Sequence, residues 1–269
     1  MPTPKELFDA GRLNAAIEAL TQEVREAPAD PQKRTFLFEL LSFAGDWDRA
    51  EKQILAAVGA DAQSQMAAAV YRGLLQAERD RARVFAGKAR PHFLRSVPGH
   101  VEKGLAALGH VGEGRIAEAR ALLDEAEEER PPLSGRRGET PFADLRDFDD
   151  LCGAVVEVVF QGKYTWFPLE QARSLEPTPP KKLRDLIWPG ARITADDGTT
   201  GDVFLFALYP GSPSHSDDLI RLGRMTDWKN LSEDLQTGLG LRTFLVDDED
   251  VSIFELGSVD FDPREAEPS

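Results

Sequence analysis

A short pattern that recurs at helical-repeat spacing constrains this chain more than any other feature. Its copies begin at Gly11, Gly45 and Gly114, and each continues with a polar residue, an apolar residue and a later alanine (Ala16, Ala50 and Ala119). The first two glycines lie 34 residues apart, and the third lies 69 further on, close to two repeat lengths. This period is typical of paired antiparallel helices stacked as tetratricopeptide-like units. Such stacks bind peptides or helices on a concave face, which favours a binding protein over an enzyme.

The chain changes character after residue 130. Residues 1–130 carry helical periodicity, whereas residues 131–141 contain three prolines, two glycines and no periodicity. We therefore predict an α+β protein with a tetratricopeptide-like helical-repeat domain over 1–130, a linker over 131–141 and a mostly antiparallel α+β domain over 142–262. Residues 263–269 are predicted to be a disordered tail.

In the first part, apolar residues spaced three and four apart predict helices over 13–24, 36–44 and 47–55. The longest predicted helix covers 62–84. Its periodicity is expected to turn four side chains inward, which are Met66, Val70, Leu74 and Leu75. Because residues 60–95 fit the repeat poorly, we interpret them as a divergent unit.

In the second part, paired apolar segments around short turns predict three hairpins. They join 154–160 to 164–167, 192–194 to 203–206, and 244–246 to 251–254. Residues 183–188 predict a short helix that ends before Pro189. Trp166 and Trp188 are expected in the core.

Charge and composition limit the partners and the compartment. The net charge of −15 divides into −3 over residues 1–130, from 18 Lys and Arg against 21 Asp and Glu, and −12 over residues 131–269, from 14 against 26. An acidic surface repels phosphate backbones, so nucleic acid is not an expected partner. The single cysteine, Cys152, fits a reducing compartment. With no signal-peptide pattern and no apolar run near the roughly 20 residues that cross a bilayer, we expect a cytoplasmic protein that does not contact the membrane.

One stretch of this acidic chain is strongly basic. Between residues 72 and 95 there are seven basic side chains and two acidic ones. Either these residues form a solvated helix face that offsets neighbouring carboxylates, or they form a docking patch for an acidic segment. Trp228 is a further candidate for partner binding, because exposed aromatic side chains can anchor an interface, although such residues more often belong to a core. The candidate partner-binding residues are Arg72, Arg79, Arg81, Arg83, Arg90 and Trp228.

The sequence offers little for catalysis, metals or cofactors, and none is predicted. Four histidines and one cysteine have no zinc-motif spacing. Residues 215–217 contain His, Ser and Asp, but adjacent residues cannot converge as a triad. The glycines of 109–114 predict a turn between helices rather than a phosphate loop, and the acidic residues 247–250 predict a solvated hairpin tip rather than a calcium loop.

Several blocks in order along the chain resemble the ImpE family, also called TagJ or SciE, an accessory component of type VI secretion clusters. The first half carries Phe43-Ala44-Gly45-Asp46-Trp47. The second half carries Gly162-Lys163-Tyr164-Thr165-Trp166-Phe167-Pro168, Tyr209-Pro210-Gly211-Ser212 and Leu222-Gly223-Arg224-Met225-Thr226-Asp227-Trp228. The resemblance covers about residues 7–245, nearly the whole chain.

This resemblance implies a cytosolic, non-enzymatic adaptor. Its expected partners are a helix near the N-terminus of the small contractile-sheath subunit and a ClpV-type AAA+ unfoldase. Two other functions remain open at this point. One is a hydrolase or transferase with its site in the acidic C-terminal domain, and the other is a generic helical-repeat scaffold unrelated to secretion.

Overall fold

The helical pairs form where the repeat predicts them. The computed structural model describes residues 2–59 and 61–263, so the predicted disordered tail lies outside the described residues, apart from Pro263. The helices before the first strand are α1 (Pro4–Asp9), α2 (Leu13–Glu26), α3 (Pro31–Phe43), α4 (Trp47–Ala57), α5 (Ala62–Phe85), α6 (Gly99–Gly112) and α7 (Ile116–Glu129). The repeat alanines are fully buried, and the three repeat glycines connect α1 to α2, α3 to α4 and α6 to α7.

The repeat glycines are required by the backbone. Gly11, Gly45 and Gly114 have φ values of +73°, +70° and +76°, a left-handed conformation that strains any residue with a Cβ. At Gly45 a Cβ would also lie 2.7 Å from Cβ of Pro213, whereas at Gly114 it would meet nothing within 4 Å. The two positions therefore separate backbone strain from steric overlap.

We expect Gly114→Ala to lower the free energy of unfolding by about 1 kcal/mol and Gly45→Ala by roughly 1–3 kcal/mol more. The second variant must push the loop that carries Pro213 away from the α3–α4 turn. Equilibrium unfolding in urea measures both. Equal losses in the two variants would contradict a close contact between this turn and the loop.

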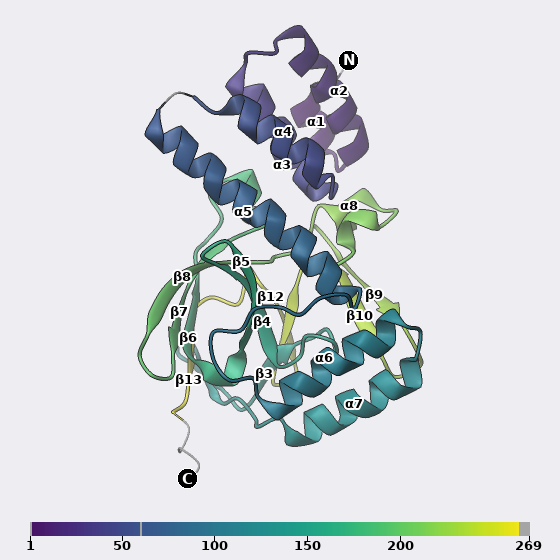
Figure 1. Ribbon diagram of the computed structural model, residues 1–269, viewed down its shortest axis with the longest axis vertical. Coiled ribbons are helices and arrows are strands. Elements are labelled where there is room, and N and C mark those ends of the chain that lie inside the picture. The colour runs from purple at the N-terminus through teal and green to yellow at the C-terminus, as the bar shows by residue number, and fades with distance from the viewer. Residues whose placement is uncertain (1, 60, 264–269) are drawn as a thin grey trace.

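The long helix α5 is only half covered. Leu74 and Leu75 are buried as predicted, but the inward orientation predicted for Met66 and Val70 is wrong, because their side chains are 71% and 40% exposed. The first half of α5 extends past the sheet beside α3 and α4, and the second half lies across the sheet (Figure 1). The sequence period is the same in both halves, but the sheet covers only the second.

The helical pairs do not form one continuous stack. The pair α6–α7 lies at the opposite end of α5 from α1–α4, beside the sheet (Figure 1). The helical pairs predicted over residues 1–130 are therefore present, but α1–α4 and α6–α7 do not stack directly on each other. Because α5 is 24 residues long, it separates the pairs that the repeat period would have placed in contact.

Antiparallel strands build the second half. The large sheet has the order β2-β1-β13-β6-β7-β8-β4-β5, a three-stranded sheet has the order β12-β11-β3, and β10 pairs with β9. The bounds are β1 (Gly135–Arg137), β2 (Thr140–Phe142), β3 (Leu145–Asp147), β4 (Val155–Phe160), β5 (Lys163–Pro168), β6 (Ala172–Pro177), β7 (Gly190–Ala195), β8 (Thr200–Leu205), β9 (Thr226–Asn230), β10 (Gln236–Gly240), β11 (Thr243–Val246), β12 (Glu249–Ser252) and β13 (Val259–Phe261). The predicted hairpins are confirmed as β4–β5, β7–β8 and β11–β12.

Short helices fill some of the connections. They are the 3₁₀ turns η1 (Leu169–Gln171), η2 (Leu183–Leu186) and η3 (Ser212–Ser214), and the α-helical turn α8 (Asp218–Arg221). The predicted helix over 183–188 is therefore the 3₁₀ turn η2. Along the described residues, no helix combines the length and apolar character needed to cross a bilayer.

The predicted linker is part of the sheet. Strands β1 and β2 form a hairpin within 135–142, and Gly135 of β1 pairs with Phe261 of β13. The sheet therefore begins before the predicted boundary at residue 142. The prolines misled the prediction because Pro141 lies on the outermost strand, where a missing N–H breaks no ladder.

One core joins the helices to the sheet. Val155 and Val159 of β4 face the helices and pack in the same core as Leu74 and Leu75, whereas Val156 and Val158 face a second core within the β-domain. Trp166 and Trp188 belong to the shared core, as predicted. Because side chains alternate along a strand, Glu157 points to the helix side, into the middle of this apolar contact.

Candidate functional site

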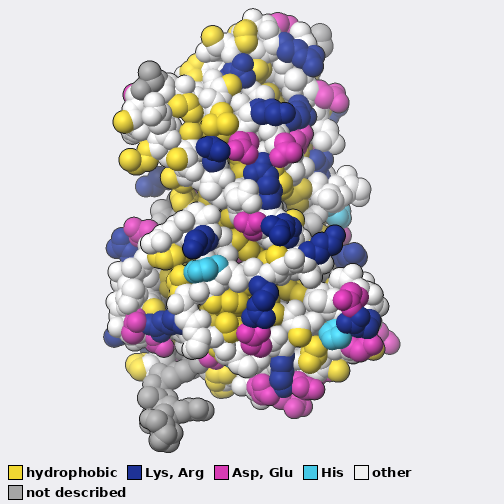
Figure 2. All heavy atoms as spheres, in the orientation of Figure 1, with side chains coloured by type: hydrophobic (Ala, Val, Ile, Leu, Met, Phe, Trp, Pro, Cys, Tyr) yellow, Lys and Arg dark blue, Asp and Glu magenta, His cyan; other side chains and the backbone are white. Residues whose placement is uncertain are grey.

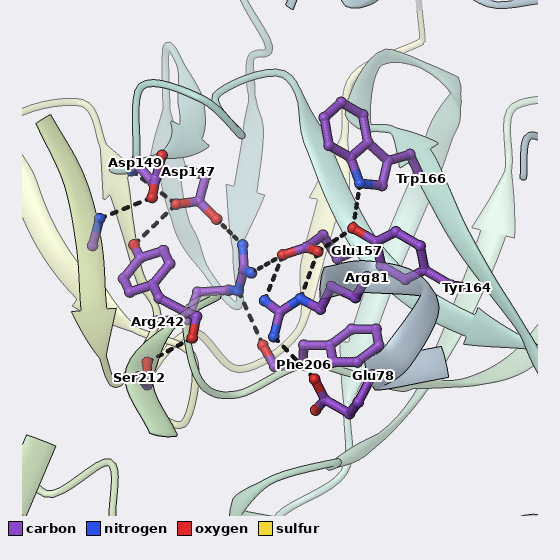
Figure 3. A network of polar contacts seen from close by, with 12 residues as sticks. Glu78, Arg81, Asp147, Asp149, Glu157, Tyr164, Trp166, Phe206, Ser212 and Arg242 are labelled. Atoms are coloured by element: carbon purple, nitrogen blue, oxygen red, sulfur yellow. Dashed lines mark hydrogen bonds and ion pairs between the residues drawn. The ribbon is translucent and has the colours of Figure 1, made fainter. Parts of the chain in front are cut away.

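Where α5 crosses the sheet, the contact depends on buried charges (Figure 3). Arg81 of α5 donates from Nε and Nη2 to the two carboxylate oxygens of Glu157 on β4, at 2.8 and 2.7 Å. Arg242, which precedes β11, donates to Glu157 and also to Asp147 at the end of β3. All four side chains are almost fully buried. This network therefore ties a helix and three separate strand regions into one body.

Aromatic side chains complete the network. The Tyr164 hydroxyl donates to Glu157 and accepts from Nε1 of Trp166 at 2.6 Å. The guanidinium of Arg81 lies 4.4 Å from the ring centre of Phe206, a cation–π contact in a desolvated site. Buried charges are tolerated only when they are paired and hydrogen-bonded, and these partners meet that requirement.

The neighbouring carboxylates differ in their protonation. Burial alone would raise the pKa of Glu157, but the charges of Arg81 and Arg242 lower it to about 2. Burial and the nearby charge of Asp147 raise the pKa of Asp149 to about 7, although Thr237, Gly238 and Leu151 donate hydrogen bonds to it. In this network Glu157 therefore stays ionised, whereas Asp149 can titrate near neutral pH.

A cleft of about 200 Å³ opens beside this network. It lies between the α3–α4 turn, α5 and the loop that follows β8, and its lining includes Trp47, Glu78 and Tyr209. Oε1 of Glu78 accepts from Nε1 of Trp188 at 2.9 Å, and Oε2 lies 3.6 Å from Nη1 of Arg81. Burial raises the pKa of Glu78. These groups pair with one another, so the cleft continues the structural network.

The predicted basic patch is divided by the fold. Arg81 is 3% exposed and belongs to the core network, so its prediction as part of an exposed docking patch is wrong. Arg79 is held by Asp48 and Glu51 of α4. Arg72, Arg83 and Arg90 are exposed, and their carboxylate partners are Glu51, Asp80 and Glu102. Arg72 and Arg83 lie about 16 Å apart along the axis of α5, so the exposed cations form a row rather than a cluster.

Trp228 lies away from this row. It is half-buried on β9, with its ring centre 4.6 Å from that of Phe148 and 5.7 Å from that of Tyr209. In Figure 1, β9 lies on the α6–α7 side of the molecule, whereas α5 begins at the opposite side. The structure does not bring Trp228 together with the predicted arginines.

Two motifs that we interpreted as loops are loops only in part. Residues 109–112 belong to α6, so the turn predicted over 109–114 begins at residue 113, and residues 247–248 form the tip of the β11–β12 hairpin while 249–250 belong to β12. His215 lies 3.3 Å from Asp227, and its Nδ1 accepts from the backbone of Asp217, which caps α8. Burial raises the pKa of the Cys152 thiol well above its ordinary value, which suppresses the reactive thiolate.

Sequence reasoning missed the central residues of the network. Glu157 carried a usable signal, because a lone carboxylate interrupts the apolar run Val155-Val156-Glu157-Val158-Val159. Such a residue in a strand buried on both faces requires a buried cation. No comparable local signal marks Arg242 or Asp147, because their neighbours in sequence resemble an ordinary strand end and an acidic loop.

The fold and the network define a class of α+β protein in which helical pairs are fixed to an antiparallel sheet by buried ion pairs. The X-ray structure of protein VPA1032 from Vibrio parahaemolyticus has the same fold, with a TM-score of 0.89 over 97% of this chain and 98% of that chain at 24% identity. Residues 139–260 match the family model described as ImpE protein. The chain is also 38% identical to the type VI secretion system accessory component TagJ of Pseudomonas aeruginosa, over 97% of this chain and 92% of that protein. The chain belongs to the ImpE family.

Proposed function

We propose that this protein is a non-enzymatic, cytoplasmic adaptor of a type VI secretion system. The observation that carries this proposal is the 38% identity to TagJ over 97% of this chain and 92% of that protein. On this proposal the protein binds a helix near the N-terminus of the small contractile-sheath subunit. A ClpV-type AAA+ unfoldase is its proposed second partner, so that the protein modulates sheath assembly or recycling.

The chemistry of the buried groups supports a role without catalysis. The ionised groups at the centre of the network pair with one another: Arg81 and Arg242 hold Glu157, and Arg242 also holds Asp147. A catalytic carboxylate instead needs an open position beside it for a substrate. Among residues 2–59 and 61–263, His, Cys, Asp and Glu side chains do not gather in threes as a metal site requires.

The rigidity of the molecule supports an adaptor role. The shared core and the network hold the helical pairs on the sheet, so a helix bound to the helical half is fixed relative to the β-domain. A rigid receptor loses less conformational entropy on binding than a hinged one. Such a protein can present one bound partner to another in a defined orientation.

The direct test is a titration of the protein with a labelled peptide spanning the N-terminal helix of the cognate small sheath subunit, followed by fluorescence anisotropy at low and moderate salt. We expect saturable binding with a Kd in the micromolar range or below. A wild-type protein that binds neither this peptide nor assembled sheath would overturn the proposal.

The exposed arginines provide a second prediction. We expect the triple variant Arg72→Glu, Arg83→Glu, Arg90→Glu to bind the peptide about tenfold more weakly at low salt, and its affinity to depend less on salt, because rim charges mainly set the encounter rate and orientation. The control is Lys5→Glu, Arg136→Glu, Arg192→Glu, which changes three exposed cations elsewhere by the same total charge. If both variants weaken binding equally, net charge rather than this row is responsible.

A further inference from the structure

Exposed apolar side chains gather at one end of the helical half. Five large hydrophobic side chains of the described residues are exposed, and three of them lie on α4 or the first half of α5: Leu55 (47% exposed), Met66 (71%) and Val70 (40%). Figure 2 shows hydrophobic side chains clustered over the end of α4 and the first turns of α5. We call Leu55, Met66 and Val70, together with the exposed Ala62 and Ala69, the α4–α5 apolar face.

The shape of this face suits a helix. Met66 and Val70 are four residues apart and form a ridge, and the small side chains of Ala62 and Ala69 allow a second helix to approach beside it. The face ends at Gly73, where a Cβ would lie 3.5 Å from the backbone of Gly162 in the β4–β5 turn. From Ala62 to Gly73 the face is about 16 Å long, the length of roughly three helical turns.

A cation lies beside the face. Lys52 lies one turn before Leu55 on α4, is exposed, and makes no ion pair with another described residue. Arg72 lies beside the face on α5, and its side chain is 56% exposed while it contacts Glu51. Glu51 balances the charge of Arg72, and Asp61 caps α5 next to Ala62, so Lys52 is the cation beside the face that has no ion-pair partner among the described residues. In a protein of net charge −15, this cation complements a partner helix that carries a carboxylate beside its apolar stripe.

The same observations disfavour a second copy of the chain on this face. Two copies of net charge −15 repel each other. The contact area of three large exposed side chains is also well short of the roughly 800 Å² per partner that stable association of two proteins requires. A single amphipathic helix needs less area, because its side chains at positions i and i+4 can pack on both sides of the ridge formed by Met66 and Val70. Met66 also adapts its shape to the surface it meets.

We propose that the α4–α5 apolar face is the docking surface for an amphipathic helix with an acidic flank. This inference rests on the proposed function, in which the occupant is the N-terminal helix of the small sheath subunit. The apolar side chains of Leu55, Met66 and Val70 provide the contact area. Lys52 orients the bound helix through its carboxylate.

The test uses the full chain and the same labelled sheath peptide. The double variant Met66→Asp, Val70→Asp is expected to weaken binding at least tenfold, because the peptide's apolar stripe would meet two carboxylates. The matched control is Met225→Asp, at a methionine that is 50% exposed between α8 and β9, and it should bind within twofold of wild type. The conservative variant Met66→Leu should also retain binding. Since all these side chains are exposed, urea unfolding should give the same midpoint for each variant as for wild type.

The outcomes separate this inference from the proposed function. If wild type binds the peptide and Met66→Asp, Val70→Asp binds equally well, the docking surface is overturned and the adaptor function stands. If the double variant instead dissociates a wild-type dimer in sedimentation while its peptide affinity is unchanged, a second copy occupies the face and the inference is overturned. If wild type binds neither peptide nor sheath, both the function and this inference fail.

Discussion

Replacing Glu157 with Gln is expected to lower the free energy of unfolding by about 3–5 kcal/mol. The amide would leave Arg81 with only the more distant carboxylate of Glu78, 3.6 Å away, and Arg242 with only Asp147. The loss is larger than the value of an exposed ion pair, because a desolvated charge without a partner cannot recover its hydration. Equilibrium unfolding in urea, followed by circular dichroism and by tryptophan fluorescence, measures the effect. Trp166 reports directly on this region, because it donates to Tyr164 within the network.

Two further variants make this prediction specific. Arg192→Ala removes an ion pair with Asp202 in which both side chains are more than half exposed, and we expect a change within about 0.5 kcal/mol. Combining Arg81→Met with Glu157→Gln should cost less than the sum of the two single changes, because each removes the same contact. A loss below about 1 kcal/mol for Glu157→Gln would mean that apolar packing alone holds α5 on the sheet.

The second large effect is on the pH dependence of stability. The pKa of Asp149 is raised to about 7 in the folded protein, against roughly 3.9 in an unfolded chain. Between these values the native state binds more protons than the unfolded state, so the free energy of unfolding falls as pH rises from about 4 to 7 and is then constant. The difference between the two pKa values sets an upper limit of about 4 kcal/mol on this fall. Glu157 acts in the opposite sense at lower pH, because its pKa of about 2 adds stability that is lost as pH falls from about 4.5 to 2.

Asp149→Asn should make the fall in stability between pH 4 and 7 shallower, and the remaining slope comes from other carboxylates whose pKa is raised by burial, such as Glu78 and Asp147. The slope is the measured quantity, because the amide NH₂ would replace one carboxylate oxygen and face the donors that now bond to it, either Leu151 or Thr237 and Gly238. This change would lower stability at every pH. Urea unfolding at several pH values from 4.5 to 8 gives the slopes of wild type and variant. Asp202→Asn, at an exposed carboxylate, is the control and should keep the wild-type slope. If Asp149→Asn also keeps it, Asp149 is ionised in the native protein throughout this range.

These two predictions concern the part of the molecule that makes it one rigid body. The network lies between the second half of α5 and the sheet, and the first half of α5 carries most of the α4–α5 apolar face. A helix bound at that face is therefore linked to the β-domain through a helix that is fixed at its other end.

Local signals predicted much of the fold. Glycine followed by an apolar stripe placed the starts of α2, α4 and α7, because a left-handed turn requires glycine and the following helix requires a buried face. Alternating apolar residues around short turns placed the β4–β5, β7–β8 and β11–β12 hairpins. These features depend on backbone conformation and on neighbours within about 15 residues, which a sequence contains directly.

The errors arose where long-range contacts decided the outcome. Met66 and Leu74 occupy similar positions in one helical pattern, but the sheet covers only the second. Arg81 and Arg83 lie two residues apart in one basic stretch, and only Arg81 faces Glu157 from 76 residues away in the chain. Pro141 contributed to the prediction of a linker over 131–141, because its strand β2 is part of the sheet only through β1, which pairs with β13 more than 110 residues further on.

By itself, the sequence determined the helical pairs, the antiparallel hairpins, the acidic surface and the membership of the ImpE family. Each of these follows from residue spacing, from composition or from similarity to known relatives along the chain. Only the tertiary structure decided which charges are buried, which apolar side chains remain exposed, and that the two halves share one core. The physical reason is that burial is a property of a side chain's surroundings, and those surroundings come from segments that no local pattern specifies.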